Sequence, residues 1–208
     1  MGRCSATDQP LFAVFDGMGG EECGEVASYL AAQTLAGLER AGDPERELLS
    51  YCKMANDEIC RYTQEQGLRS VGTTAAILWM QKHKIYLCNI GDSPIFRYAD
   101  GELEQISVDH VSVAMAGKKP PLLQNLGIPE SEMLISPYTA EGYYQKGDIY
   151  LICSDGLTDM VDAAEISRIL QTDNRADTAE TLLQRALDRG GKDNVSFVLL
   201  YIEKNKWF

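Results

Sequence analysis

Residues 11–20 read LFAVFDGMGG: five apolar residues, then Asp16, then a glycine-rich turn. A short apolar run that is bounded by turn residues is typical of a strand buried in a core. We therefore expect a strand over residues 11–15, with Asp16 at the edge of the sheet where that strand ends. Glycine directly after the aspartate lets backbone groups and ligands approach closely. This stretch predicts a buried sheet whose edge carries a carboxylate.

Two amphipathic helices are expected after this turn, because apolar residues recur at helical spacing along one face of each segment. The first extends from about residue 22 to about residue 42. The second begins at Asp43 and Pro44, where a proline early in a helix is harmless, and it ends near Gly67. Each helix is apolar on one face only, so each is expected to cover one surface of the protein.

Apolar runs separated by short turns follow the helices. The links between the first four are too short for a parallel crossover, so these strands are expected to pair antiparallel. A later strand precedes two further helices, and another strand follows them. The expected strands are residues 73–80, 84–90, 94–99, 102–106, 149–153 and 195–202. The interval 117–137, which is rich in Lys, Pro and Gly, predicts an irregular surface excursion.

The chain has 208 residues, with 19 Lys and Arg against 31 Asp and Glu, and a formal net charge of −12. This length suits one domain, which we expect to extend over residues 1–208. An acidic surface repels polyanions, so neither nucleic acid nor a membrane is expected as a partner. Six cysteines without a C-x-x-C pair, and the lack of a signal-like or membrane-length apolar run, predict a cytoplasmic protein.

An aspartate beside or near a glycine stands at four of the expected strand ends. Several such turns at one sheet edge would form a cluster of oxygen ligands, which a hard divalent cation such as Mg²⁺ or Mn²⁺ prefers. Any one of them is also explained as ordinary turn chemistry, because Asp and Gly both favour turns. The four together, each next to an apolar strand, favour a metal site. They are Asp16, Asp92, Asp155 and Asp193.

The segments around these aspartates resemble the motifs of the metal-dependent protein phosphatases of type 2C, and they occur in that family's order. The resemblance extends over about residues 11–203 and rests on several motifs. It implies an α+β fold, a four-layer αββα sandwich in which helices flank two antiparallel β-sheets. The matching segments are residues 12–20, 24–28, 72–74, 89–93, 109–110, 153–159 and 192–196.

The resemblance also implies hydrolysis of phosphoserine and phosphothreonine in proteins, with a Ser/Thr kinase as the opposing enzyme. The implied cofactors are two Mn²⁺ or Mg²⁺ ions that bridge the attacking water, with no catalytic side chain beyond the metal centre. Asp16, Asp155 and Asp193 are the implied carboxylate ligands, and Gly17 would contribute its backbone carbonyl. Asp92 matches an aspartate that, with the Asp155 position, binds a further metal ion in many members.

The first ten residues depart from the family's pattern. Relatives carry an arginine and then an acidic segment on a strand before the glycine-rich turn, and residues 1–10 show neither. Met18 stands where some relatives have a histidine that is proposed as general acid. We therefore expect the N-terminal strand segment to be missing, by truncation or in a short variant. This leaves an alternative function, a catalytically impaired phosphatase fold that binds phosphoproteins or acts as a regulatory module.

Overall fold

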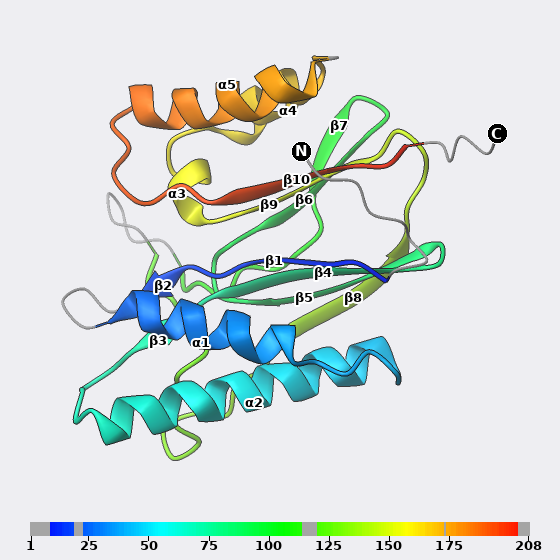
Figure 1. Ribbon diagram of the computed structural model, residues 1–208. Helices are drawn as coiled ribbons and strands as arrows, with labels where there is room; N and C mark the ends of the chain where they lie inside the picture. Colours follow the sequence, from blue (N-terminus) through cyan, green and yellow to red (C-terminus); the bar gives the residue numbers. More distant parts are fainter. Residues whose placement is uncertain (1–8, 19–22, 114–119, 173, 204–208) are drawn as a thin grey trace.

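Two four-stranded antiparallel sheets form the centre of the molecule, and helices lie outside each of them (Figure 1). The computed structural model describes residues 9–18, 23–113, 120–172 and 174–203. The first sheet has the strand order β1-β4-β5-β8 and the second has the order β10-β9-β6-β7. Their strands are β1 (Leu11–Val14), β4 (Ala75–Gln81), β5 (Lys84–Ile90), β8 (Tyr138–Tyr143), β10 (Phe197–Tyr201), β9 (Ile149–Cys153), β6 (Ile95–Ala99) and β7 (Glu102–Gln105).

The two long N-terminal helices, α1 (Gly24–Ala36) and α2 (Pro44–Glu65), cover the outer face of the first sheet. Asp43 caps α2, because its side chain accepts a hydrogen bond from the backbone N–H of Arg46. The start of α2 is therefore as predicted. The first helix is shorter than predicted: it ends at Ala36, well before residue 42.

The outer face of the second sheet is covered by α4 (Ala163–Leu170) and α5 (Arg175–Asp188). Three small elements lie near one end of the sheets. The helical turn α3 (Asp155–Thr158) directly follows β9, and β2 (Gly17–Met18) pairs with β3 (Gly72–Thr73). Two of them, α3 and β2, were not predicted, and the third, β3, arises because the strand expected at residues 73–80 is divided at Thr74. Asp16 directly precedes β2, and Asp155 is the first residue of α3.

Alternate residues of β4 enter two different cores. Ile77 and Trp79 pack against α1 and α2, whereas Leu78 and Met80 pack against the second sheet. This explains why the strand is a continuous apolar run, since both of its faces are covered. A third core lies between the second sheet and the helices α4 and α5. Three successive cores separate four layers, so the predicted four-layer αββα sandwich is confirmed.

The chain between β7 and β8 is less peripheral than the predicted surface excursion. Leu126 is fully buried in the core under α2, and it forms an isolated β-bridge with Thr73. Asn56 of α2 accepts hydrogen bonds from the backbone N–H groups of Gly127, at 2.8 Å, and Ile128, at 3.0 Å. The prediction of a surface excursion is wrong for this part, because a buried asparagine supplies the partners that inward-facing backbone needs.

Strand β8 completes the first sheet where no strand was predicted. It pairs with β5 from Lys84↔Tyr143 to Asn89↔Tyr138. Its Glu141 and Gly142 disfavour a strand by local preference, so β5 supplies the partner that stabilises it.

The expectation of a missing N-terminal strand segment rests on residues 1–10. Of these, residues 1–8 lie outside the described residues. Within the described ranges, no helix has both the length and the apolar character that crossing a bilayer requires.

Candidate metal centre

The topology brings the four aspartate turns to one edge of the sandwich. β1 and β5 both run antiparallel to β4, so Asp16 after β1 and Asp92 after β5 leave the first sheet at the same end. β9 and β10 are antiparallel partners, so Asp155 after β9 and Asp193 before β10 lie at one end of the second sheet. The link that carries Asp92 runs from β5 in the first sheet to β6 in the second, and it therefore joins the two ends.

The other three aspartates all act electrostatically on the carboxyl group of Asp16. Its pKa is raised from the ordinary value of 3.8 to about 7. Burial is the largest cause, followed by the charge of Asp155 and a hydrogen bond with it, and then by the charges of Asp193 and Asp92. Like charges held close together disfavour ionisation, so a proton is retained near neutral pH. All four predicted aspartates therefore lie within electrostatic reach of one carboxyl group.

The side chains in the described ranges do not form a ready-made coordination shell. No group of three or more His, Cys, Asp or Glu side chains there is arranged so that it could hold a metal ion. Charges influence one another over longer distances than metal–ligand bonds, which reconciles this finding with the raised pKa of Asp16. The electrostatic effect of the other three aspartates on Asp16 locates the candidate site at this edge. The ligand roles of the four aspartates remain predictions.

Gly17 lies where the Asp16 turn meets the start of α1. A Cβ atom at Gly17 would come within 2.1 Å of the carbonyl oxygen of Gly24, the first residue of that helix. No side chain fits this approach, so the position requires glycine. The turn after β1 is thereby held against α1. The predicted use of the Gly17 carbonyl as a metal ligand is not tested by this contact.

Ser154 fastens the Asp155 turn to the loop that carries Asp193. Its hydroxyl donates to the carbonyl of Asn194 at 3.2 Å and accepts from the backbone N–H of Ser196 at 3.1 Å. Its own N–H donates to the carbonyl of Ser196 at 2.9 Å. These three contacts cross from the end of β9 to the start of β10. They set the separation of two of the predicted metal ligands.

His110 holds the Asp92 turn through hydrogen bonds with Gly91. Its backbone N–H donates to the carbonyl of Gly91 at 2.9 Å, and its Nδ1 accepts from the N–H of Gly91 at 3.3 Å. Its Nε2 lies 3.2 Å from the carbonyl oxygen of Ser136, which assigns the ring proton to Nε2. Both ring nitrogens are engaged with backbone, so His110 holds the turn in position.

Sequence reasoning did not single out the serines beside the aspartates. Ser93 is fully buried, and its carbonyl accepts a hydrogen bond from Asn89 Nδ2 at 2.7 Å. Ser154 is 1% exposed. The available signal was a small hydroxyl residue directly next to a candidate ligand at a strand end. Such residues can satisfy backbone groups in a turn without projecting into the site.

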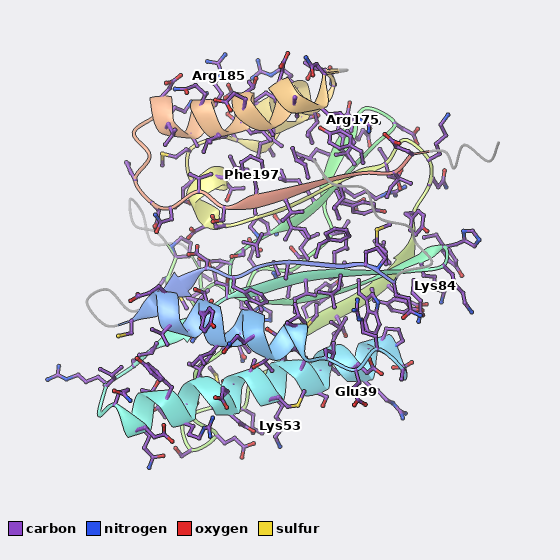
Figure 2. The ribbon with its side chains drawn as sticks, viewed as in Figure 1. Glu39, Lys53, Lys84, Arg175, Arg185 and Phe197 are labelled. Carbon is purple, nitrogen blue, oxygen red and sulfur yellow. The ribbon has the colours of Figure 1, made fainter. Side chains whose placement is uncertain are left out.

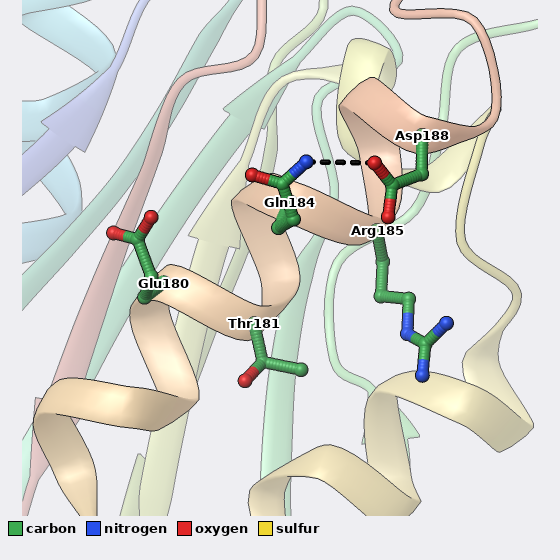
Figure 3. A pocket seen from close by; sticks show the side chains of 5 residues that line it. All are labelled: Glu180, Thr181, Gln184, Arg185 and Asp188. Carbon is green, nitrogen blue, oxygen red and sulfur yellow. Dashed lines mark hydrogen bonds between the residues drawn. The ribbon is translucent and has the colours of Figure 1, made fainter.

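Two shallow surface hollows lie away from the aspartate turns. A shallow depression of about 400 Å³ is lined by five side chains of α5, among them Gln184, which donates to Asp188 at 2.7 Å (Figure 3). A second, of about 310 Å³, includes Arg175 at the start of α5. In Figure 2, Arg175 and Phe197 lie toward opposite ends of the second sheet, and Phe197 is at the aspartate end. Neither hollow contains any of the four aspartates.

The chain thus has a four-layer αββα sandwich with four aspartate turns at one edge, which is the arrangement that the motif resemblance implied. Residues 2–190 match the family described as Protein phosphatase 2C. The chain is 31% identical to the serine/threonine phosphatase stp of Listeria innocua, over 95% of this chain and 85% of that protein.

Solved structures agree with this match. The serine/threonine phosphatase PstP/Ppp of Mycobacterium tuberculosis has a TM-score of 0.84 at 31% identity, over 93% of this chain and 88% of that one. The catalytic domain of PstP in complex with two manganese ions has a TM-score of 0.80 at 34% identity, over 91% of this chain and 86% of that one. This chain belongs to the protein phosphatase 2C family.

Proposed function

We propose that the aspartate edge binds two divalent cations and that the protein uses them to hydrolyse phosphoserine and phosphothreonine in other proteins. Its family and its relatives make the chain a serine/threonine protein phosphatase. The observation that carries the metal assignment is the convergence of Asp155, Asp193 and Asp92 on Asp16, whose pKa is raised to about 7. Burial and the neighbouring acids both disfavour the ionised form of Asp16, and a bound cation would offset both effects.

The donor set fits a hard divalent cation. The proposed ligands are all oxygen atoms: the carboxylates of Asp16, Asp155 and Asp193 and the carbonyl of Gly17. Oxygen-only sites suit Mg²⁺ and Mn²⁺ rather than softer metals. Asp92 is proposed to join Asp155 in binding a third ion. The two manganese ions in the PstP structure support Mn²⁺ as the first ion to test.

Two cations bound by these residues would supply an activated water and would neutralise charge on the phosphoryl oxygens, so no protein nucleophile would be required. The protein's own contribution is to hold the carboxylates at one edge through Ser154, His110 and the glycine contacts. His110 does not act as a general acid in this proposal, because both of its ring nitrogens bond to backbone. His83 lies in the β4–β5 turn, at the far end of those strands from Asp92.

The acidic surface is compatible with a phosphorylated substrate. A net charge of −12 would repel a phosphate dianion from most of the molecule. Bound cations reverse the sign of the potential locally, so the aspartate edge becomes the place where phosphate is attracted. The proposed partners are therefore phosphoproteins and, indirectly, the Ser/Thr kinase that modifies them, and the proposed location is the cytoplasm. No observation favours the catalytically impaired alternative.

A phosphothreonine peptide tests the proposal. Phosphate release is measured after addition of Mn²⁺, and in parallel after chelation. We expect release that depends on Mn²⁺ and that falls by at least about a hundred-fold in Asp155→Asn, because one proposed ligand loses its charge. Asp188→Asn, an exposed acid on α5 that accepts from Gln184, is the matched control and retains activity. Full activity of Asp155→Asn, or of the chelated enzyme, would refute the metal assignment.

A further inference from the structure

Thr74 faces Asp16 in the register that continues from β1 and β4. Val14 pairs with Ala76, and two residues further along the backbone N–H of Thr74 donates to the carbonyl of Asp16 at 2.9 Å. In an ordinary antiparallel pair the two residues exchange both backbone hydrogen bonds. Here the N–H of Asp16 donates instead to the side-chain Oγ1 of Thr74, at 3.0 Å. The carbonyl of Thr74 accepts from the hydroxyl of Thr73 at 3.0 Å.

The same hydroxyl also reaches the Asp92 turn. Thr74 Oγ1 lies 2.7 Å from the hydroxyl oxygen of Ser93, the residue directly after Asp92. Thr74 is 1% exposed and Ser93 is fully buried, so water does not compete for this hydrogen bond. One oxygen atom therefore bonds to the backbone of the Asp16 turn and to a side chain of the Asp92 turn.

The methyl group of Thr74 packs against the same turn. Gly91 has a φ of +111°, and a Cβ atom there would come within 2.6 Å of Thr74 Cγ2. The turn thus contacts Thr74 through both branches of that side chain, and it is also hydrogen-bonded to His110 through Gly91. This position therefore suits a β-branched side chain that carries both a methyl group and a hydroxyl group. Valine would preserve the shape, and serine would preserve the hydroxyl.

We propose that Thr74 is a positioning residue of the metal centre, whose hydroxyl sets the separation of the Asp16 and Asp92 turns and so determines how tightly the site binds its divalent cation. Thr74 acts through Asp16 and Ser93. The inference rests on the proposed function, because it assumes that the aspartate edge binds metal. Groups that orient metal ligands typically change metal affinity about 10- to 100-fold when they are removed. A residue that only fills the core would lower stability without changing metal affinity.

Calorimetric titration of Mn²⁺ into the metal-stripped 208-residue protein provides the test. Thr74→Val is expected to raise the Kd for Mn²⁺ about 10- to 100-fold, and Thr74→Ser to restore it to within about three-fold of wild type. Thr178→Val is the matched control. Thr178 is a buried threonine of α5 whose hydroxyl donates to the carbonyl of Asn174 and bonds to Thr172 Oγ1. Its loss is expected to lower stability and to leave the Kd for Mn²⁺ unchanged.

Ser93→Ala removes the hydrogen bond between the Thr74 and Ser93 hydroxyl groups by deleting the Ser93 hydroxyl. This variant tests the inference if Thr74→Val does not fold. Its Kd for Mn²⁺ is also expected to rise, and the double variant is expected to bind no more weakly than Thr74→Val, since both remove one shared interaction. A wild-type Kd in folded Thr74→Val, or in Ser93→Ala if only that variant folds, overturns the inference and leaves the proposed function intact. Wild-type protein that takes up no Mn²⁺ overturns both.

Discussion

Gly156 faces the carbonyl oxygen of Asn194 so closely that a Cβ atom on Gly156 would lie 2.2 Å from that oxygen. The contact joins the residue after Asp155 to the residue after Asp193. Because the obstacle is backbone, a side chain at Gly156 can be accommodated only if one of the two loops shifts. The spacing between the proposed ligands Asp155 and Asp193 thus depends on the absence of a Cβ atom at Gly156.

Gly156→Ala is therefore expected to reduce both stability and phosphatase activity. Overpacking of this kind costs about 1–3 kcal/mol of unfolding free energy, which urea denaturation measures. The shift of the Asp193 loop should also weaken Mn²⁺ binding. Gly142→Ala is the control, because the nearest atom to its Cβ would be a side-chain carbon of Ile85 at 3.6 Å, an ordinary contact. Equal behaviour of the two variants would contradict this account.

The raised pKa of Asp16 predicts how the stability of the metal-free protein depends on pH. The folded-state pKa of about 7 lies above the ordinary value of 3.8, so between these two pH values the folded state holds a proton that the unfolded state has already released. This contribution to stability is complete below about pH 4 and is lost as the pH rises through about 7. The Tm of the chelator-treated protein should therefore fall as the pH rises from about 4 to about 7.

The comparison between variants isolates Asp16 from other titrating groups. Asp155→Asn removes the largest charge that acts on Asp16, so the fall in Tm over the same pH range should be smaller than in wild type. Asp188→Asn should retain the wild-type fall. An unchanged pH dependence in Asp155→Asn would show that the two carboxyl groups are not coupled.

Arg97 and Asp148 form an ion pair whose loss should affect stability alone. Arg97 donates to Asp148 through Nε at 3.0 Å and through Nη2 at 3.1 Å, and the Asp148 side chain is only 5% exposed. Arg97→Met should cost about 1–3 kcal/mol in urea denaturation, because a buried carboxylate loses its bidentate partner. Lys84→Met breaks the more exposed pair with Glu141 and should cost less than about 1 kcal/mol. A smaller loss in Arg97→Met than in Lys84→Met would contradict the prediction.

Asn56 should hold the backbone next to Leu126 in its folded conformation. Asn56→Ala removes the acceptor for the N–H groups of Gly127 and Ile128 and the donor to the carbonyl of Ile128. Faster hydrogen exchange at these two amides is expected, with a loss of about 1–3 kcal/mol in unfolding free energy. Asp57→Ala, at an exposed neighbour in α2, should leave both amides protected. Continued protection of both amides in Asn56→Ala would count against this role.

Local pattern was sufficient for the elements whose own residues carry the signal. The run before Asp16 predicted β1, and the proline and cap at the start of α2 predicted its first residue. Strand β8 could not be predicted, because Glu141 and Gly142 form a strand only when β5 supplies the hydrogen-bonding partner. Leu126 could not be assigned to the core for the same kind of reason, since Asn56, which holds the backbone beside it, lies far away in the sequence.

The sequence by itself was enough to predict which residues would bind a metal, because a carboxylate at a strand end beside or near a glycine can be recognised from the residue order alone. Tertiary structure decided that Asp16, Asp92, Asp155 and Asp193 share one edge, through strand directions that no local pattern contains. It also decided the roles of Thr74 and Ser154, whose hydroxyls bond to turns that are distant in sequence. A hydroxyl has no function until folding brings its partner within about 3 Å, because hydrogen bonds act only at short range.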